Sequence, residues 1–374
     1  MHVSRLISRV IGAFYVIGMC AAHRLARMLL SRAPVGTDSD LLYPANLPYL
    51  PMKTRLPLAA ALTLASSLTA FADVKVNDTL SVGGYAVGSY RNTETDPGTS
   101  ADKFDLDAAK ALFTGTFKPV TGVVSLYYQP GAPSDVTLLD AYATVDVGGG
   151  TSVTAGKFLS YLGYEAFDIP NMTQVSYANG DFLGPIPGYH TGVRVDGGDK
   201  DTGWGLALLD SVYSGTYYLK GDGELKHNAG FEGYFTYKAI PDVTLWAGFA
   251  YETKGNIIHK NEAILTLDFW ASYNLSKEIT VAAELCTKDG GKGDKGNNWL
   301  LFLNYAIDKN WSSAFRVSGE KLSNGGPGFT KLTVAPTYKV NDNFAVRAEL
   351  SYYDYSKHTA NSATFFALQS IFKF

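Results

Sequence analysis

Cysteine is nearly absent from this sequence: only Cys20 and Cys286 occur among the 374 residues. We expect an N-terminal leader to be removed together with Cys20, and a single cysteine can form neither an intrachain disulfide framework nor a cysteine zinc site. No apolar run after Ala72 approaches the length of a membrane-spanning helix. No stretch has a convincing helical period either. These absences argue against a disulfide-stapled domain and against a helical membrane protein.

A secretory signal peptide is expected at residues 52–72. The segment MKTRLPLAAALTLASSLTAFA has a basic start, an apolar run and a small-x-small end, which are the three parts of such a peptide. We expect cleavage between Ala72 and Asp73. The apolar run is too short to span a bilayer comfortably, which argues against an anchor. Because this segment is complete by itself, we interpret residues 1–51 as a spurious upstream extension and residues 73–374 as the mature domain.

The expected mature chain is acidic. Residues 1–72 hold 7 of the 32 lysines and arginines and 2 of the 35 aspartates and glutamates, so 25 basic and 33 acidic residues remain, a net charge of −8. Nucleic-acid binding calls for a basic patch, so no nucleic-acid partner is expected. A secreted chain without a spanning helix then belongs to one of two main classes, a soluble all-β protein or a membrane β-barrel.

Apolar and polar residues alternate with a period of two through most of the mature chain. In LTLDFWASYNL (265–275) and FAVRAELSYY (344–353), every second residue is apolar, and most residues between them are polar or small. Such alternation over about ten residues predicts β-strands with one apolar face. Seven short turns rich in Gly, Asn, Asp and Pro alternate with eight longer polar connections, which predicts about sixteen strands. The first and third long connections are residues 92–102 and 160–189.

This order of strands, turns and loops is typical of an all-β transmembrane antiparallel up-and-down β-barrel of the outer membrane. A sheet in lipid must close on itself, because lipid offers its edges no hydrogen-bond partner. The outward face would then contact outer-membrane lipid. A soluble β-sandwich also alternates, but aromatic residues near the strand ends match the girdles of membrane barrels and favour that fold. Examples are Tyr251, Tyr273, Trp311, Tyr338 and Phe374.

About sixteen strands would enclose an aqueous lumen. The inward parity carries charged residues in many strands, and burying them in a dry core would be costly. We therefore interpret the lumen as a water-filled channel. The inward charges are Asp140, Asp146, Arg194, Glu232, Lys238, Asp268, Glu284, Arg316, Glu320, Lys339, Arg347 and Glu349.

The connection 160–189 is far longer than a membrane hairpin needs, and long loops of this kind are usually functional. We expect it to fold into the barrel and narrow it, with its acids opposite basic wall residues, so that solutes are selected by size and charge. The alternative is an extracellular cap that folds outward. The candidate pore residues are Glu165, Asp168 and Asp181 on the loop and Arg194, Arg316, Arg347 and Glu349 on the wall.

Three short motifs flank or lie within this loop: GKF (156–158), GYEAFD (163–168) and GYHTGVRV (188–195). They resemble the motifs of the OmpL-like β-barrel porins of bacterial outer membranes, and the resemblance covers essentially all of the mature chain. It implies a diffusion channel in the outer membrane. The predicted number of strands is similar to that of the larger general porins, which form trimers. OmpL-type channels with fewer strands are monomers. A homotrimer and a monomer both stay open.

No catalytic or cofactor site is expected. An enzyme would need a nucleophile beside a base, and none of the four histidines of the mature chain lies in a nucleophile motif. A lone histidine such as His190 is also a poor metal site, so no metal is predicted. We expect a porin for passive diffusion of small hydrophilic solutes and ions. The alternative is a structural or adhesive outer-membrane barrel without an open pore.

The last segment, ATFFALQSIFKF (363–374), alternates up to the final residue. Termini fray unless they are tied down, so we expect this segment to be the last strand, paired with the first near residues 79–90. It resembles the terminal strand by which the bacterial barrel assembly machinery recognises outer-membrane proteins, which usually ends in Phe. The predicted lipid-facing assembly residues are Phe374, Phe372, Leu368 and Phe366.

Overall fold

The computed structural model describes residues 74–130, 136–178, 182–213, 225, 229–253, 262–291, 294–323 and 325–374. The expected signal peptide and the upstream extension lie outside these ranges, as does Asp181. Within the described ranges, no helix is long and apolar enough to cross a membrane.

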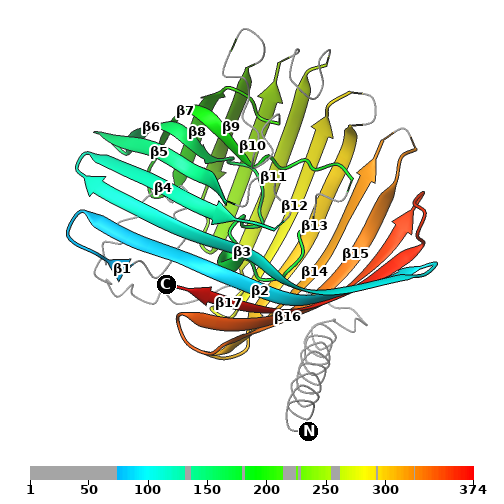
Figure 1. Ribbon diagram of the computed structural model, residues 1–374. Coiled ribbons are helices and arrows are strands. Elements are labelled where there is room, and N and C mark those ends of the chain that lie inside the picture. The colour runs from blue at the N-terminus through cyan, green and yellow to red at the C-terminus, as the bar shows by residue number, and fades with distance from the viewer. Residues whose placement is uncertain are drawn as a thin grey trace, which may run out of the picture. The chain divides into compact units, whose positions relative to one another are not determined.

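Sixteen long antiparallel strands form one closed sheet (Figure 1). Each pairs with its neighbours along the chain, and the last pairs with the first, so the predicted sixteen-stranded up-and-down barrel is confirmed. A two-residue strand β1 (Val74–Lys75) pairs with β2 beside this ring. The long strands are β2 (Leu80–Asp96), β3 (Thr99–Phe117), β4 (Val120–Tyr128), β5 (Val136–Gly148), β6 (Thr151–Leu159), β7 (Tyr189–Gly198), β8 (Thr202–Leu209), β9 (Gly230–Tyr237), β10 (Val243–Glu252), β11 (Ile264–Asn274), β12 (Ile279–Asp289), β13 (Lys295–Ala306), β14 (Trp311–Leu322), β15 (Gly328–Lys339), β16 (Phe344–Ser356) and β17 (Ser362–Lys373).

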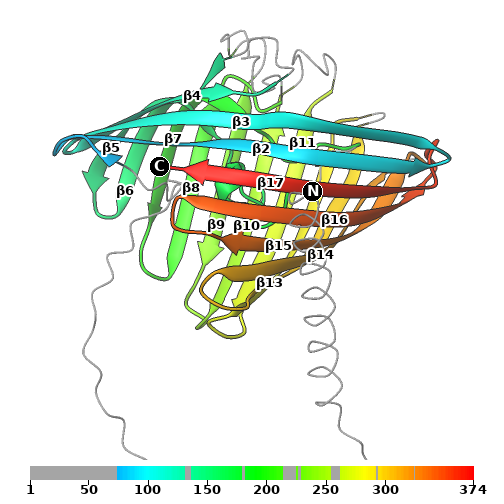
Figure 2. The ribbon, with the colours of Figure 1, turned by 60° about the horizontal axis from the view of Figure 1, so that its bottom comes forward.

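The chain ends where the barrel closes. β17 lies between β16 and β2 and pairs with β2 along its whole length (Figure 2). Two backbone hydrogen bonds fix the final residue: Gly84 N–H donates to Phe374 O at 2.8 Å, and Phe374 N–H donates to Gly84 O at 3.0 Å. Phe372 is exposed on the outer face, whereas Gln369 is buried on the inner face. The predicted pairing of the last strand with the first is confirmed.

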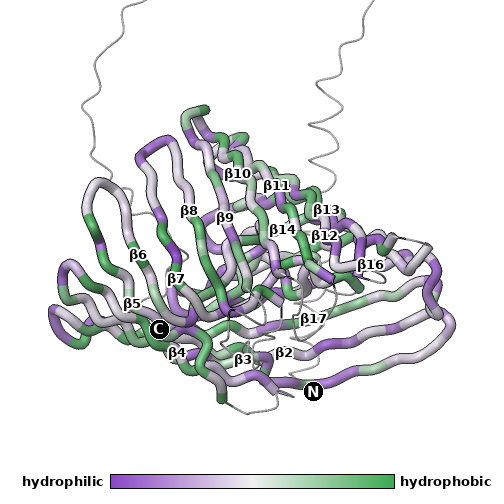
Figure 3. Tube along the Cα trace, turned by 90° about the horizontal axis from the view of Figure 1, so that it is seen from above, coloured by the Kyte–Doolittle hydropathy of each residue, from purple (hydrophilic) through white to green (hydrophobic). Residues whose placement is uncertain are grey.

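The alternation gives the barrel two different faces, and hydropathy changes repeatedly along the strands in Figure 3. In β11, Leu265, Leu267 and Phe269 are 36–49% exposed, whereas Thr266 and Asp268 between them are 0% exposed. Large apolar side chains on the outer face suit contact with hydrocarbon. The polar side chains of the same strand therefore face the lumen, where they can contact whatever occupies it.

The first long connection differs from the prediction. The sequence predicts a loop at residues 92–102, but β2 and β3 continue through this segment and turn at Pro97 and Gly98. Most side chains at the tip of this hairpin are exposed on both faces. A strand without a buried face has no apolar stripe, so its polar sequence resembles that of a loop.

Candidate functional site

The third long loop, residues 160–188, connects β6 to β7. Apart from the single 3-10 turn η1 (Ile169–Asn171), with a proline in its first positions, its described part has no regular secondary structure. Its polar contacts are made with inward-facing side chains of strands on both sides of the barrel, among them β3, β9, β11, β12, β14 and β16. The loop therefore lies against the inner face of the wall.

Three wall carboxylates hold the start of the loop. Glu232, Asp268 and Glu284 each accept a hydrogen bond from a backbone N–H of residues 161–164, at 3.2, 2.8 and 2.6 Å. Gly163 has φ +103°, a conformation that side-chain-bearing residues rarely adopt, and it allows the backbone to turn here. The carboxylates thus satisfy loop N–H groups that no secondary structure satisfies.

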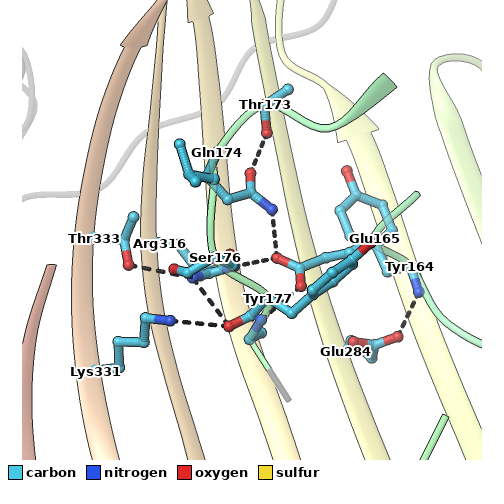
Figure 4. A network of polar contacts seen from close by, with 12 residues as sticks. Tyr164, Glu165, Thr173, Gln174, Ser176, Tyr177, Glu284, Arg316, Lys331 and Thr333 are labelled. Atoms are coloured by element: carbon cyan, nitrogen blue, oxygen red, sulfur yellow. Dashed lines mark hydrogen bonds and ion pairs between the residues drawn. The ribbon is translucent and has the colours of Figure 1, made fainter. Parts of the chain in front are cut away.

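Glu165 and Arg316 form an ion pair near the middle of the loop (Figure 4). Their side chains are 4% and 0% exposed. Gln174 donates to Glu165 at 2.6 Å, and Arg316 also donates to the carbonyl oxygen of Ser176 at 2.8 Å. Because both charges are buried, loss of one partner would leave the other uncompensated. The structure thus brings together two of the residues predicted from the sequence.

β16 supplies a second anchor. Arg347 donates to the carbonyl oxygens of Met172 and, at 3.2 Å, of Gln174. Glu349 accepts the backbone N–H groups of the two residues that follow Gln174, at 2.5 and 2.9 Å. The sequence predicts Arg347 opposite a loop carboxylate, but the arginine instead binds backbone carbonyl groups, because an irregular loop leaves many of these groups without partners.

The second half of the loop is held in the same way. Glu320 accepts two backbone N–H bonds, both at 2.6 Å, from residues 182–183. Lys288 donates to a carbonyl oxygen of the same segment at 3.2 Å. Tyr213, from the following long loop, donates its hydroxyl to the carbonyl oxygen of Pro185 at 2.9 Å. Parts of two loops therefore meet inside the barrel.

Asp168 contacts strands β2 and β3, which follow β16 and β17 in the closed sheet. Lys110 Nζ lies 3.2 Å from Asp168 Oδ1 and 3.0 Å from Asp140 Oδ2, so one ammonium group serves two carboxylates. Tyr85 donates its hydroxyl to Asp168 at 3.0 Å. Burial raises the pKa of the Asp168 carboxyl, and the nearby Lys110 charge acts in the opposite direction. The basic partner of Asp168 is thus a lysine rather than one of the predicted arginines.

Among the described residues of the loop, no carboxylate forms an ion pair with Arg194, which differs from the prediction. Its Nε lies 3.3 Å from Asp196 Oδ2, and its guanidinium carbon lies 5.3 Å from the centre of the Tyr161 ring. Asp196 is two residues farther along β7 and therefore on the same face of the strand, which makes it the nearest carboxylate. The remaining predicted loop acid, Asp181, lies outside the described residues.

The charged side chains beside the loop are buried, which corrects the expectation that water surrounds them. Arg316, Arg347 and Glu349 are 2%, 3% and 1% exposed. Lys331, at 0% exposed, donates to the carbonyl oxygen of Tyr177 at 2.9 Å. Buried charges need partners, and the loop backbone supplies them. Strand parity identifies inward charges such as Arg316 and Arg347 but carries no information about the groups that face them.

Aromatic side chains support the start of the loop. Tyr234, Trp246 and Trp270 lie on the neighbouring strands β9, β10 and β11, and adjacent rings are stacked with interplanar angles of 10° and 6°. Two loop residues contact the ends of this row: the Tyr161 ring lies 4.7 Å from Tyr234, and the Tyr164 ring lies 5.5 Å from Trp270. Apolar packing therefore accompanies the polar anchors.

Solved structures of three outer-membrane proteins resemble the fold of this chain. OmpT of Vibrio cholerae has 13% identity and a TM-score of 0.56, over 81% of this chain and 100% of that chain. The anion-selective porin from Comamonas acidovorans has 11% identity and a TM-score of 0.59, over 79% and 99%. OmpF of Salmonella typhi, in complex with daunomycin, has 12% identity and a TM-score of 0.59, over 81% and 100%. At these identities the likeness concerns the fold alone.

The family assignment comes from a comparison of sequences. No curated protein matches the chain. The model of the family described as "Putative beta-barrel porin-2, OmpL-like" matches residues 81–374, which include all sixteen long strands except the first residue of β2. The chain belongs to this OmpL-like β-barrel porin family.

Proposed function

We propose that this protein is an outer-membrane porin, a channel through which small hydrophilic solutes and ions diffuse passively. The observation that carries the proposal is a closed sixteen-stranded barrel with a long loop bound to its charged inner wall. Family membership and the porin folds of similar structures support it. The protein would be exported by the signal peptide at residues 52–72 and would lie in the outer membrane.

In this proposal the third loop sets the width and the charge of the passage. Glu165 and Asp168 on the loop, with Arg316, Arg347 and Glu349 on the wall, would hold the loop in place through their buried contacts, and the constriction so formed would select solutes by size and charge. Diffusion requires no reaction, so the proposal includes no catalytic residue and no cofactor.

Reconstitution of the purified protein into a planar lipid bilayer tests this function. We expect stepwise current increases as single channels insert, and a reversal potential in a salt gradient that measures the preference for cations or anions. A correctly folded barrel that inserts into the bilayer without any current step would contradict the proposal.

A barrel without an open pore is the second candidate, because the wall charges beside the loop are almost completely buried. In that case the wild-type barrel gives no current steps, whereas a variant that lacks residues 165–185 conducts. Current steps from both proteins favour the porin.

The assembly of the barrel involves a further partner. We propose that the barrel assembly machinery recognises β17 through Phe374, Phe372, Leu368 and Phe366. Deletion of Phe374 should lower the amount of folded protein in the outer membrane, and barrels that do assemble should keep their single-channel conductance. Equal amounts of folded wild-type and truncated protein would contradict this role.

The oligomeric state has two candidates, a monomer and a homotrimer. OmpT of Vibrio cholerae has been solved in a trimer form. We propose that the protein is a homotrimer. Native mass spectrometry in detergent distinguishes a trimer from a monomer by mass.

A further inference from the structure

Three neighbouring wall strands carry buried oxygen atoms that have no hydrogen-bond partner. They are Asp268 Oδ1 on β11, Glu284 Oε2 on β12 and Asn298 Oδ1 on β13. The three residues are 0%, 4% and 0% exposed. The register places Asp268 and Asn298 directly beside Cys286, one on each side, and Glu284 lies two residues from Cys286 on the same face of β12. The three side chains therefore flank one small residue on the inner wall.

The third loop uses the other polar atom of each side chain. Asp268 Oδ2 and Glu284 Oε1 accept backbone N–H bonds from the loop at 2.8 and 2.6 Å. Asn298 Nδ2 donates to a loop carbonyl oxygen at 3.1 Å. These bonds orient all three groups and leave one oxygen of each without a partner. A buried polar atom in that position is costly unless a ligand or an ordered water satisfies it.

The charges of the two carboxylates are also uncompensated. Among the ion pairs of the described residues, none joins a basic side chain to Asp268 or Glu284, whereas Asp140 on β5 has Lys110 at 3.0 Å. Two neighbouring buried carboxylates without a counter-charge are unstable, so a cation or a proton must compensate them. Carboxylate and amide oxygens are ligands of hard cations, and Ca²⁺ tolerates irregular arrangements of them better than Mg²⁺ does.

We propose that Asp268, Glu284 and Asn298 bind a divalent cation of the Ca²⁺ type under the start of the third loop, with water completing its coordination. Among the described residues, no group of three or more His, Cys, Asp or Glu side chains could hold a metal ion, and this site instead combines two carboxylates with one amide. The bound cation neutralises the carboxylates and stabilises their contacts with the loop. Binding does not depend on whether the barrel conducts.

Tb³⁺ luminescence tests this site, because Tb³⁺ replaces Ca²⁺ at oxygen ligands and is excited by a nearby tryptophan. Trp270 lies two residues from Asp268 on the same face of β11. Wild-type protein in non-ionic detergent should give a saturable Tb³⁺ emission that Ca²⁺ displaces. Asp268→Asn and Glu284→Gln should each weaken Tb³⁺ affinity at least about tenfold, since even supporting partners of metal ligands contribute that much. The double variant should lose the emission.

Two further variants control for indirect effects. Asp140→Asn removes a wall carboxylate that already has a lysine partner, and it should keep the Tb³⁺ affinity of the wild type. Bound Ca²⁺ should also raise the unfolding temperature of the wild type relative to protein in EDTA. Trp270→Phe should weaken the Tb³⁺ emission but keep this rise in unfolding temperature. The heat-dependent shift of electrophoretic mobility reports whether each variant is folded.

Two results would overturn the proposal. In the first, the wild-type protein shows neither saturable Tb³⁺ emission nor a Ca²⁺-dependent unfolding temperature. A proton, and not a cation, would then compensate the two carboxylates. The other is a folded double variant that binds Tb³⁺ as tightly as the wild type.

Discussion

Two segments that the sequence predicts as long polar connections, residues 92–102 and residues 160–188, have opposite surroundings in the fold. The first forms the tip of the β2–β3 hairpin, where most side chains are exposed and contacts are local, as in the Lys103–Asp105 ion pair at 2.6 Å. The second crosses the inner wall, and its contacts join distant parts of the chain, as in the Glu165–Arg316 pair. The prediction of a connection therefore does not tell whether the segment projects from the barrel or lies against its inner wall.

The largest effect is expected for Arg316→Met, which leaves Glu165 buried without a counter-charge. Removal of one partner of a buried pair costs about 3–5 kcal/mol. We expect a lower midpoint of urea unfolding in detergent and a larger single-channel conductance, because the loop loses an anchor. The double variant Arg316→Met with Glu165→Gln is the control and should recover much of the lost stability. Equal losses in both variants would contradict the importance of the pair.

Glu349→Ala should have the next largest effect, since it removes the acceptor of two loop N–H groups. Leaving such buried donors without a partner costs about 1–3 kcal/mol. Hydrogen exchange followed by mass spectrometry should show faster exchange in residues 172–178. Glu349→Gln keeps an acceptor oxygen and should lose less protection than Glu349→Ala. The same exchange rates in wild type and Glu349→Ala would show that this contact does not hold the loop.

The pH should change loop docking through Asp168. Burial raises its pKa in the docked loop above the ordinary value of 3.8. The Asp168 carboxyl therefore binds a proton more tightly in the docked loop than in a free loop. Docking should strengthen as the pH falls toward the ordinary pKa of Asp168, and it should weaken as the pH rises through the raised pKa. Limited proteolysis of the loop, measured against pH, should show this trend in the wild type. Asp168→Asn should remove it, and an identical pH profile in the variant would refute the assignment.

The smallest effect is expected at the hairpin tip. Lys103 is 61% exposed, and among the described residues its ion pair is with Asp105 on the same strand. Exposed pairs of this kind contribute little, so Lys103→Ala should change the free energy of unfolding by no more than about 0.5 kcal/mol. Urea unfolding under the conditions used for Arg316→Met gives the comparison. A loss as large as that of Arg316→Met would remove the contrast between the two segments.

The period-two alternation predicts the strands and the inward positions of Arg316 and Glu349, and the order of seven short turns and eight long connections predicts a barrel of about sixteen strands. Lipid and lumen impose opposite polarities on the two faces of each strand, and that contrast is visible in the sequence. It disappears at residues 92–102, where both faces are exposed, and the strands there were not predicted.

The partners of the inward charges could not be predicted in the same way. Glu165 and Arg316 are 151 residues apart, and no spacing rule connects them. Asp168 pairs with Lys110, which is 58 residues away in the sequence. Glu349 binds backbone groups, which are present in every residue and therefore leave no trace in the sequence.

The contacts of the third loop with the inner wall make it the element that should control passage through the barrel. Single-channel conductance in planar bilayers, compared between the wild type and a variant lacking residues 165–185, measures this control. We expect a clearly larger conductance for the variant, with the barrel still folded by its electrophoretic mobility. An unchanged conductance in a folded variant would show that the loop lies outside the path of the ions.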